Sequence, residues 1–169
     1  MKYGEIIKYS IAEGLGIRCA LFVSGCMRHC KNCYNQQLWD FKYGREFTKE
    51  TYNSIVEILK QPHIAGLSLL GGEILDQGRD NIEILKNLCK VAHELKKNVW
   101  CWTGYTWEEF PKLQEYQREL IKSCDVLVDG AYIDELKDLS LAFRGSSNQR
   151  IINVKKSLKQ NKIVQLNLD

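Results

Sequence analysis

The sequence predicts an α/β fold with a mostly parallel sheet, and two observations support this. Short apolar runs typical of buried strands alternate with longer stretches in which apolar residues recur at helical spacing. The runs are almost continuously apolar, as expected for strands covered on both faces. At 169 residues the chain is long enough for one domain with a sizeable core, and we expect that domain to span residues 1–169.

The first predicted strand and helix lie in the N-terminal third. Residues 19–23 (CALFV) are continuously apolar and follow two nearby glycines. A helix is expected over residues 48–60, with Thr48 as its N-cap and Pro62 just beyond its end. Its apolar side chains recur every three or four residues: Tyr52, Ile55, Val56 and Leu59.

The middle of the chain continues the alternation. Residues 66–73 predict the second strand, which ends in Gly-Gly-Glu. An apolar stripe over residues 80–97 predicts a helix, and Asp80 with Glu83 resembles its capping box. Residues 99–102 (VWCW) predict the third strand.

The C-terminal half adds a helix and two strands. A helix is expected from Thr106, capped with Glu109, through Leu120. Residues 125–129 predict the fourth strand and residues 151–154 a further one. Strands and helices in this alternation are usually joined by right-handed crossovers.

The composition is that of a soluble globular protein, with 44% hydrophobic and 27% charged residues. The net charge of +3 comes without a basic cluster, which argues against nucleic-acid binding. The sequence shows no signal peptide and no apolar run of membrane-spanning length. We therefore expect a cytoplasmic protein without nucleic-acid or membrane partners, in which the seven cysteines are free thiols or metal ligands.

Three cysteines at CxxxCxxC spacing, Cys26, Cys30 and Cys33, define the cysteine loop (residues 26–33). Three thiolates at this spacing can converge on one metal centre, and thiolates favour zinc or iron-sulfur clusters. Three ligands on a 4Fe-4S cube leave one iron without a protein ligand, which is typical of a catalytic site. The loop follows the first predicted strand, at the strand end where α/β folds carry their chemistry.

Other interpretations of the cysteine loop remain open at this point. His29 with the three cysteines would complete a closed Cys3His zinc site, and a disulfide is a further alternative. The more ordinary role for His29 is a solvated residue or a hydrogen-bonding neighbour of a metal ligand. The remaining cysteines lie in apolar patterns and are interpreted as small core residues: Cys19, Cys89, Cys101 and Cys124.

The cysteine loop and the Gly-Gly-Glu segment together resemble the radical S-adenosylmethionine superfamily. Within it, the chain resembles the activating proteins of anaerobic ribonucleoside-triphosphate reductase, from near the N-terminus to about residue 150. Two departures from that family are Lys31-Asn32, where Pro-Gly is frequent, and Ile74, where proline is common. The segments that carry the resemblance are residues 14–18 (GLGIR), 22–26 (FVSGC), 33–35 (CYN), 102–105 (WTGY), 126–130 (VLVDG) and 144–149 (RGSSNQ).

The resemblance implies an open partial (β/α) barrel of about four to six mostly parallel strands, of the radical S-adenosylmethionine type. It implies a 4Fe-4S cluster on Cys26, Cys30 and Cys33, with S-adenosylmethionine on the fourth iron and no catalytic residue beyond the cluster ligands. Glu73 would accept hydrogen bonds from the ammonium group, and Gly71 and Gly72 would let the backbone approach. The cofactor-binding residues implied are Asn32, Cys33, Tyr34, Gly71, Gly72 and Glu73.

The activity implied by the resemblance is reductive cleavage of S-adenosylmethionine to methionine and a 5'-deoxyadenosyl radical. That radical takes a hydrogen from a glycine of the reductase. The expected partners are the reductase and a low-potential electron donor such as flavodoxin. The long connection (residues 131–150) is our candidate for contacting the reductase or lining the cofactor site, and an ordinary surface loop is the alternative.

Three alternative functions stay open. The first is a radical S-adenosylmethionine enzyme with another target, such as the activase of a different glycyl-radical enzyme. The second is a zinc-stabilised binding module without catalysis. The third is an electron-transfer protein with a closed cluster, for which Cys19 would be the fourth ligand.

Overall fold

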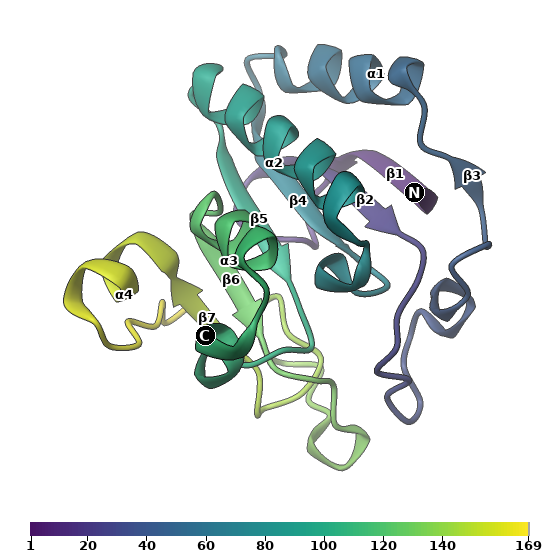
Figure 1. Cartoon of the computed structure of the whole chain (residues 1–169). Coiled ribbons are helices and arrows are strands. Elements are labelled where there is room, and N and C mark those ends of the chain that lie inside the picture. The colour runs from purple at the N-terminus through teal and green to yellow at the C-terminus, as the bar shows by residue number, and fades with distance from the viewer. Residues whose placement is uncertain (169) are drawn as a thin grey trace.

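The computed structural model describes residues 1–168, which build a seven-stranded sheet flanked by helices (Figure 1). The strands are β1 (Lys2–Ser10), β2 (Ile17–Val23), β3 (Arg45–Glu46), β4 (Ile64–Gly71), β5 (Asn98–Trp102), β6 (Val126–Asp129) and β7 (Arg150–Asn153). The α-helices are α1 (Lys49–Leu59), α2 (Arg79–Glu94), α3 (Glu115–Lys122) and α4 (Val154–Gln160). Short 3-10 helices are η1 (Gln36–Trp39), η2 (Ile74–Asp76), η3 (Trp107–Lys112) and η4 (Asp134–Leu136).

The predicted parallel arrangement is confirmed in the middle of the sheet. The strand order is β3-β1-β2-β4-β5-β6-β7, and β2, β4, β5 and β6 run parallel. The outer strands β1, β3 and β7 pair antiparallel with their neighbours. The sheet is therefore mixed, with seven strands rather than the four to six expected. Strand β1 was not predicted, because Lys2, Glu5 and Lys8 interrupt its apolar residues.

The two faces of the sheet carry different side chains. A continuous row of buried apolar residues crosses one face, and α1, α2 and α3 lie over that face (Figure 1). The row is Leu21, Leu69, Cys101, Leu127 and Ile152, each paired with the next across adjacent strands. The adjacent row on the other face contains smaller residues, Ala20 and Ser68, before Trp100 and Val126. The core thus lies between the sheet and the three helices.

Helix ends follow local capping chemistry, with two corrections to the expected pattern. The Thr48 side chain caps α1 by accepting from Thr51 N, as predicted. The predicted Asp80–Glu83 capping box is wrong, because α2 begins after Gly78 and its N-cap makes no side-chain hydrogen bond.

The helix expected from Thr106 through Leu120 is in fact two helices. The Thr106–Glu109 capping box is confirmed, but it starts the 3-10 helix η3, which contains Pro111. Leu113 then adopts an extended conformation, with φ −67° and ψ 156°, and α3 starts separately. Proline cannot supply the backbone N–H that a continuous α-helix needs. Among the helices of residues 1–168, none has the length and apolar character needed to cross a lipid bilayer.

Arg18, near the start of β2, is fully buried and connects three strands. Its guanidinium donates to Ser68 Oγ (2.7 Å) and Leu67 O (2.8 Å) on β4 and to Asn98 Oδ1 (2.8 Å) on β5. Burial lowers the pKa of Arg18 to about 10. Arg18 therefore holds the amino ends of the parallel strands together, opposite the end from which the cysteine loop leaves.

Replacing Arg18 by methionine should lower the free energy of unfolding by roughly 3 kcal/mol, because several buried acceptors lose their donor. Urea unfolding of the metal-free protein measures this change. The matched control is Arg45→Met on β3, where the arginine is exposed, and it should change stability by less than about 0.5 kcal/mol. Equal effects of the two substitutions would contradict the role given to Arg18.

Candidate functional site

A cavity of about 200 Å³ lies at the carboxyl ends of β2, β4 and β5. It is where chain segments far apart in the sequence meet: the cysteine loop, the Gly-Gly-Glu segment, the residues after β5 and the long connection. Its lining includes Cys26, Cys30, Cys33, Glu73, Trp102 and Tyr132. A larger groove of about 490 Å³ lies between α1 and α2, and no cysteine lines it. The smaller cavity is therefore the candidate site.

Backbone hydrogen bonds fix the base of the cysteine loop. Gly25 N donates to Leu38 O (2.8 Å), and Cys26 N donates to Trp39 O (3.1 Å). Gly25 has a φ of 107°, and a Cβ at this position would lie 2.2 Å from the Phe41 ring. Only glycine combines this conformation with such a close approach. The chain after β2 is thereby turned against the segment around η1.

The cysteine loop itself is tightly curled. His29 and Asn32 adopt positive φ angles of 47° and 54°, a conformation that few non-glycine residues take. Cys33 N donates to Cys30 O (3.1 Å), which closes a turn between two of the cysteines. These turns let all three cysteines reach the same cavity.

The three cysteines that line the cavity are free thiols. Burial raises the pKa of the Cys26 and Cys30 thiols, so both are protonated at neutral pH. The other cysteines are fully buried, away from the cavity: Cys19, Cys89, Cys101 and Cys124.

The closed zinc site is not formed in the described part of the chain. His29 is exposed, and its ring stacks on Trp39 with centroids 4.6 Å apart. Within residues 1–168, no three His, Cys, Asp or Glu side chains gather as ligands of a single ion. In an iron-sulfur cube each thiolate binds a different iron, so its cysteines need not meet at one point.

Gly71, Gly72 and Glu73 hold the cysteine loop from the side of β4. Gly72 N donates to Val23 O (2.7 Å), and Glu73 N donates to Gly25 O (2.7 Å). Gly71 has a φ of 118°, and a Cβ at position 72 would lie 2.4 Å from Gly25 O. The two glycines are thus required by the close approach of two backbone segments.

The Glu73 carboxylate is 2% exposed and connects β4 to the segment after β5. Its Oε1 accepts from Thr103 Oγ1 (2.7 Å) and Leu75 N (3.1 Å), and its Oε2 accepts from Gly104 N (2.7 Å). Burial raises the pKa of Glu73 to about 7, although these three donors favour the charged form. Glu73 lines the cavity, and near neutral pH its carboxyl group is therefore close to the midpoint between its protonated and ionised forms.

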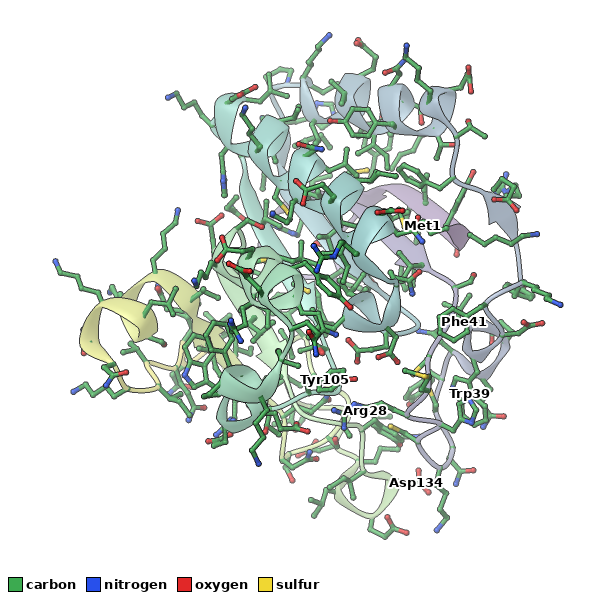
Figure 2. The ribbon with its side chains drawn as sticks, viewed as in Figure 1. Met1, Arg28, Trp39, Phe41, Tyr105 and Asp134 are labelled. Atoms are coloured by element: carbon green, nitrogen blue, oxygen red, sulfur yellow. The ribbon has the colours of Figure 1, made fainter. Side chains whose placement is uncertain are left out.

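The other two predicted cofactor residues lie at the rim of the cavity. Tyr34 lines it, is 63% exposed and packs edge-on against Tyr132, with centroids 6.1 Å apart. Asn32 is exposed, lies outside the cavity lining and donates from Nδ2 to Asp134 Oδ2 (2.6 Å). Figure 2 shows Asp134 on the loop that faces the cysteine loop. The structure thus brings all the predicted residues except Asn32 to the cavity.

Sequence reasoning gave no role to Arg28. Its guanidinium lies over the Tyr105 ring at 3.9 Å, and Nη2 approaches Glu109 Oε1 at 3.5 Å (Figure 2). The Tyr105 hydroxyl donates to Asp76 Oδ1 (3.0 Å), while Asp76 Oδ2 accepts from Met27 N (2.9 Å). The cysteine loop is therefore also packed against the segment that follows β5.

Thr103, Trp39 and Trp102 were also missed. Thr103 and Trp102 could have been found from the sequence, because they lie at the end of the third predicted strand. Glu73 follows the end of a neighbouring parallel strand, at the same edge of the sheet. Trp39 had no such signal, because it lies outside the cysteine loop in the sequence and the fold brings it beside Cys26 and His29.

Replacing Gly72 by alanine should reduce, severalfold, the iron and sulfide bound after anaerobic reconstitution, because the new Cβ displaces the base of the cysteine loop. Chemical analysis of iron and sulfide per chain measures this. Gly78→Ala is the control for an added methyl group: Gly78 has a positive φ of 75°, which strains any other residue, but no atom lies within 4 Å of an added Cβ. The control should lose stability but bind iron normally, and normal iron in both variants would contradict the prediction.

Glu73 should make the stability of the metal-free protein fall as the pH rises from about 4.5 to about 7. The folded protein holds this proton more tightly than the unfolded chain, so folding is penalised once the proton leaves, by up to about 3 kcal/mol. Above the folded pKa the penalty is constant. Urea unfolding between pH 5 and pH 8 should show a shallower slope for Glu73→Gln than for the wild type, whereas parallel pH profiles would refute the assignment.

The chain is similar to known proteins over most of its length. Residues 12–152 match the family described as 4Fe-4S single cluster domain. Proteins named anaerobic ribonucleoside-triphosphate reductase-activating protein are 40% identical in Vibrio cholerae (89% of this chain, 97% of the relative) and 40% in Escherichia coli K12 (88% and 96%). The protein of that name from Enterobacteria phage T4 is 38% identical over 89% of this chain and 93% of its own length. The chain therefore belongs to the family of anaerobic ribonucleoside-triphosphate reductase-activating proteins.

Proposed function

We propose that this chain activates anaerobic ribonucleoside-triphosphate reductase by generating the glycyl radical of that enzyme. The observation that carries the proposal is the meeting of three thiols and a Gly-Gly-Glu segment at one cavity, in a chain about 40% identical to activating proteins over most of its length. A 4Fe-4S cluster bound there would supply the electron that cleaves S-adenosylmethionine reductively to a 5'-deoxyadenosyl radical.

Cys26, Cys30 and Cys33 would hold three irons of the cluster and leave the fourth open. All three line the cavity. Cys19, the candidate fourth ligand of a closed electron-transfer cluster, belongs to the buried core with the apolar row under the helices. Its position supports an open iron, because Cys19 is fully buried in that core and does not line the cavity.

Glu73, Gly71 and Gly72 would receive the amino acid end of S-adenosylmethionine. A carboxylate offers about four lone-pair positions, and three donors of the chain use three of them in Glu73. The remaining position suits an ammonium group, whose charge would favour the ionised carboxylate. Tyr34 and Asn32, at the rim, would contact the adenosyl part, and Asn32 would first have to leave Asp134.

The sequence predicts that residues 1–169 form one domain and that its sheet is an open partial barrel. A barrel of that kind would suit a large substrate. The cavity lies at one end of the parallel strands, and Tyr132 and Gln149 of the long connection contribute to its wall. We infer that this wall faces the glycine-bearing segment of the reductase. A low-potential carrier such as flavodoxin would deliver the electron.

The function is tested by anaerobic reconstitution, dithionite reduction and electron paramagnetic resonance, with and without S-adenosylmethionine. A reduced 4Fe-4S signal that changes on adding the ligand, with 5'-deoxyadenosine formed, is expected. Addition of the anaerobic reductase should then give a glycyl-radical signal. A cluster that does not respond to the ligand would overturn the proposal, and cleavage of the ligand without radical on the reductase would redirect it to another target.

Cys30→Ala should abolish the glycyl radical, because two remaining thiolates cannot hold the cluster in place. Cys19→Ala, which removes a buried core thiol outside the cavity, should form the cluster and the radical at wild-type yield. Iron content and radical yield per chain are the measurements. A radical formed by Cys30→Ala, or lost in a folded Cys19→Ala variant, would refute the ligand assignment.

A further inference from the structure

Arg28 supplies the only positive charge among the described residues that line the cavity. It belongs to the cysteine loop, and 25% of its side chain is accessible. A molecule in the cavity can therefore contact it. Glu73 supplies the only carboxylate of the same lining. The cavity wall thus contains one cation and one carboxylate.

The Arg28 guanidinium has few partners within residues 1–168. Its one ion contact joins Nη2 to Glu109 Oε1 at 3.5 Å, which is longer than a charge-assisted hydrogen bond. Two other arginines of the chain are fully engaged: Arg18 makes hydrogen bonds as short as 2.7 Å, and Arg150 makes four of 2.5–3.0 Å to two carboxylates. Because a guanidinium carries five N–H donors, Arg28 keeps donors for a ligand.

Arg28 and Glu73 meet at Gly104. Gly104 N donates to Glu73 Oε2 (2.7 Å). A Cβ at position 104 would lie 3.3 Å from Glu73 Oε2, 3.0 Å from Arg28 Nε and 2.4 Å from Arg28 Cδ. Figure 2 shows Arg28 beside Tyr105, the residue that follows Gly104. The cation and the carboxylate are therefore neighbours, and the absence of a side chain at Gly104 leaves room for both.

A neighbouring cation and carboxylate match the two charges of an α-amino acid. The amino acid end of S-adenosylmethionine carries an ammonium group and a carboxylate on the same carbon atom. Arginine suits the carboxylate, because its planar fork can donate two parallel N–H bonds. The Arg28 guanidinium also lies over the Tyr105 ring at 3.9 Å, which restricts its orientation before a ligand arrives.

We propose that Arg28 binds the carboxylate of S-adenosylmethionine while Glu73 binds its ammonium group. The inference rests on the proposed function, because it requires the amino acid end of that ligand in this cavity. A carboxylate has lone pairs on both oxygens, so the contact with Arg28 is compatible with ligation of the open iron. Arg28 is thus a binding residue that selects a ligand with a free carboxylate.

The test compares two ligands that differ only in this group: S-adenosylmethionine and decarboxylated S-adenosylmethionine, which keeps the ammonium, the sulfonium and the adenosine. Binding is measured by anaerobic equilibrium dialysis against the reconstituted protein with an oxidised cluster, so that no ligand is cleaved. Arg28→Gln should weaken binding of S-adenosylmethionine about tenfold or more. It should bind the decarboxylated ligand as the wild type does.

Arg79→Gln is the matched control. Arg79 also lies over a tyrosine ring, that of Tyr116 at 5.3 Å, but it does not line the cavity. This variant should bind both ligands as the wild type does. Arg28→Gln binding S-adenosylmethionine with wild-type affinity, or losing the same factor for both ligands, would overturn the proposal.

Iron and sulfide per chain are measured first, because Arg28 belongs to the cysteine loop. Should Arg28→Gln fail to hold the cluster, Arg28→Lys replaces it. Lysine keeps the charge but not the fork, so S-adenosylmethionine should bind severalfold more weakly than to the wild type, with the decarboxylated ligand unaffected. Equal affinities of this variant and the wild type for S-adenosylmethionine would then refute the contact. Failure of the proposed function is recognised separately, because the wild type itself would then form no 4Fe-4S signal or bind no S-adenosylmethionine.

Discussion

Two backbone hydrogen bonds, from Gly72 N to Val23 O and from Glu73 N to Gly25 O, are the constraint on which the site depends. They join the end of β4 to the point where the cysteine loop leaves β2. Because both donors belong to the Gly-Gly-Glu segment, the loop and the segment form one unit. The glycines of this unit are required first by the packing of the chain against itself, whatever ligand they also accommodate.

The buried Glu73 carboxylate extends this unit to a third strand. Its bonds to Thr103 and Gly104 connect β4 to the end of β5, while its backbone supports the cysteine loop. A charge in this position is costly to bury, and the raised pKa expresses that cost. A cationic ligand arriving beside the carboxylate would relieve the cost, so binding and ionisation of Glu73 would be coupled.

The sequence predicted those parts of the fold that local patterns encode. Continuous apolar runs gave β2, β4, β5 and β6, and the caps at Thr48 and Thr106 were located from residue type alone. The antiparallel β1 was missed because half-exposed outer strands lack such runs. The division of this segment into η3 and α3 was not predicted, because helical spacing of the apolar residues continues across it.

The residues of the candidate site also fall into two groups: those that a local sequence pattern marks and those that only the fold brings together. Cys26, Cys30, Cys33 and Glu73 are recognisable because spacing and neighbouring residues mark them in one short segment each. Trp39 and Thr103 come to the cavity only through contacts between distant segments, which no local pattern records. Resemblance to a family supplied the coarse chemistry, whereas the hydrogen bonds that position each group required the three-dimensional structure.

The cysteine loop meets residues 134 and 135 through polar side-chain contacts, whereas backbone hydrogen bonds hold the base of the loop. Lys31 contacts Glu135 (2.7 Å) and Asn32 contacts Asp134 (2.6 Å); Asp134 is half-buried and the other three residues are exposed. Exposed polar contacts contribute little to stability, and ion pairs among them weaken further with added salt. These two contacts can therefore break at little cost in stability, whereas the backbone hydrogen bonds from Gly72 and Glu73 keep the base of the cysteine loop in place.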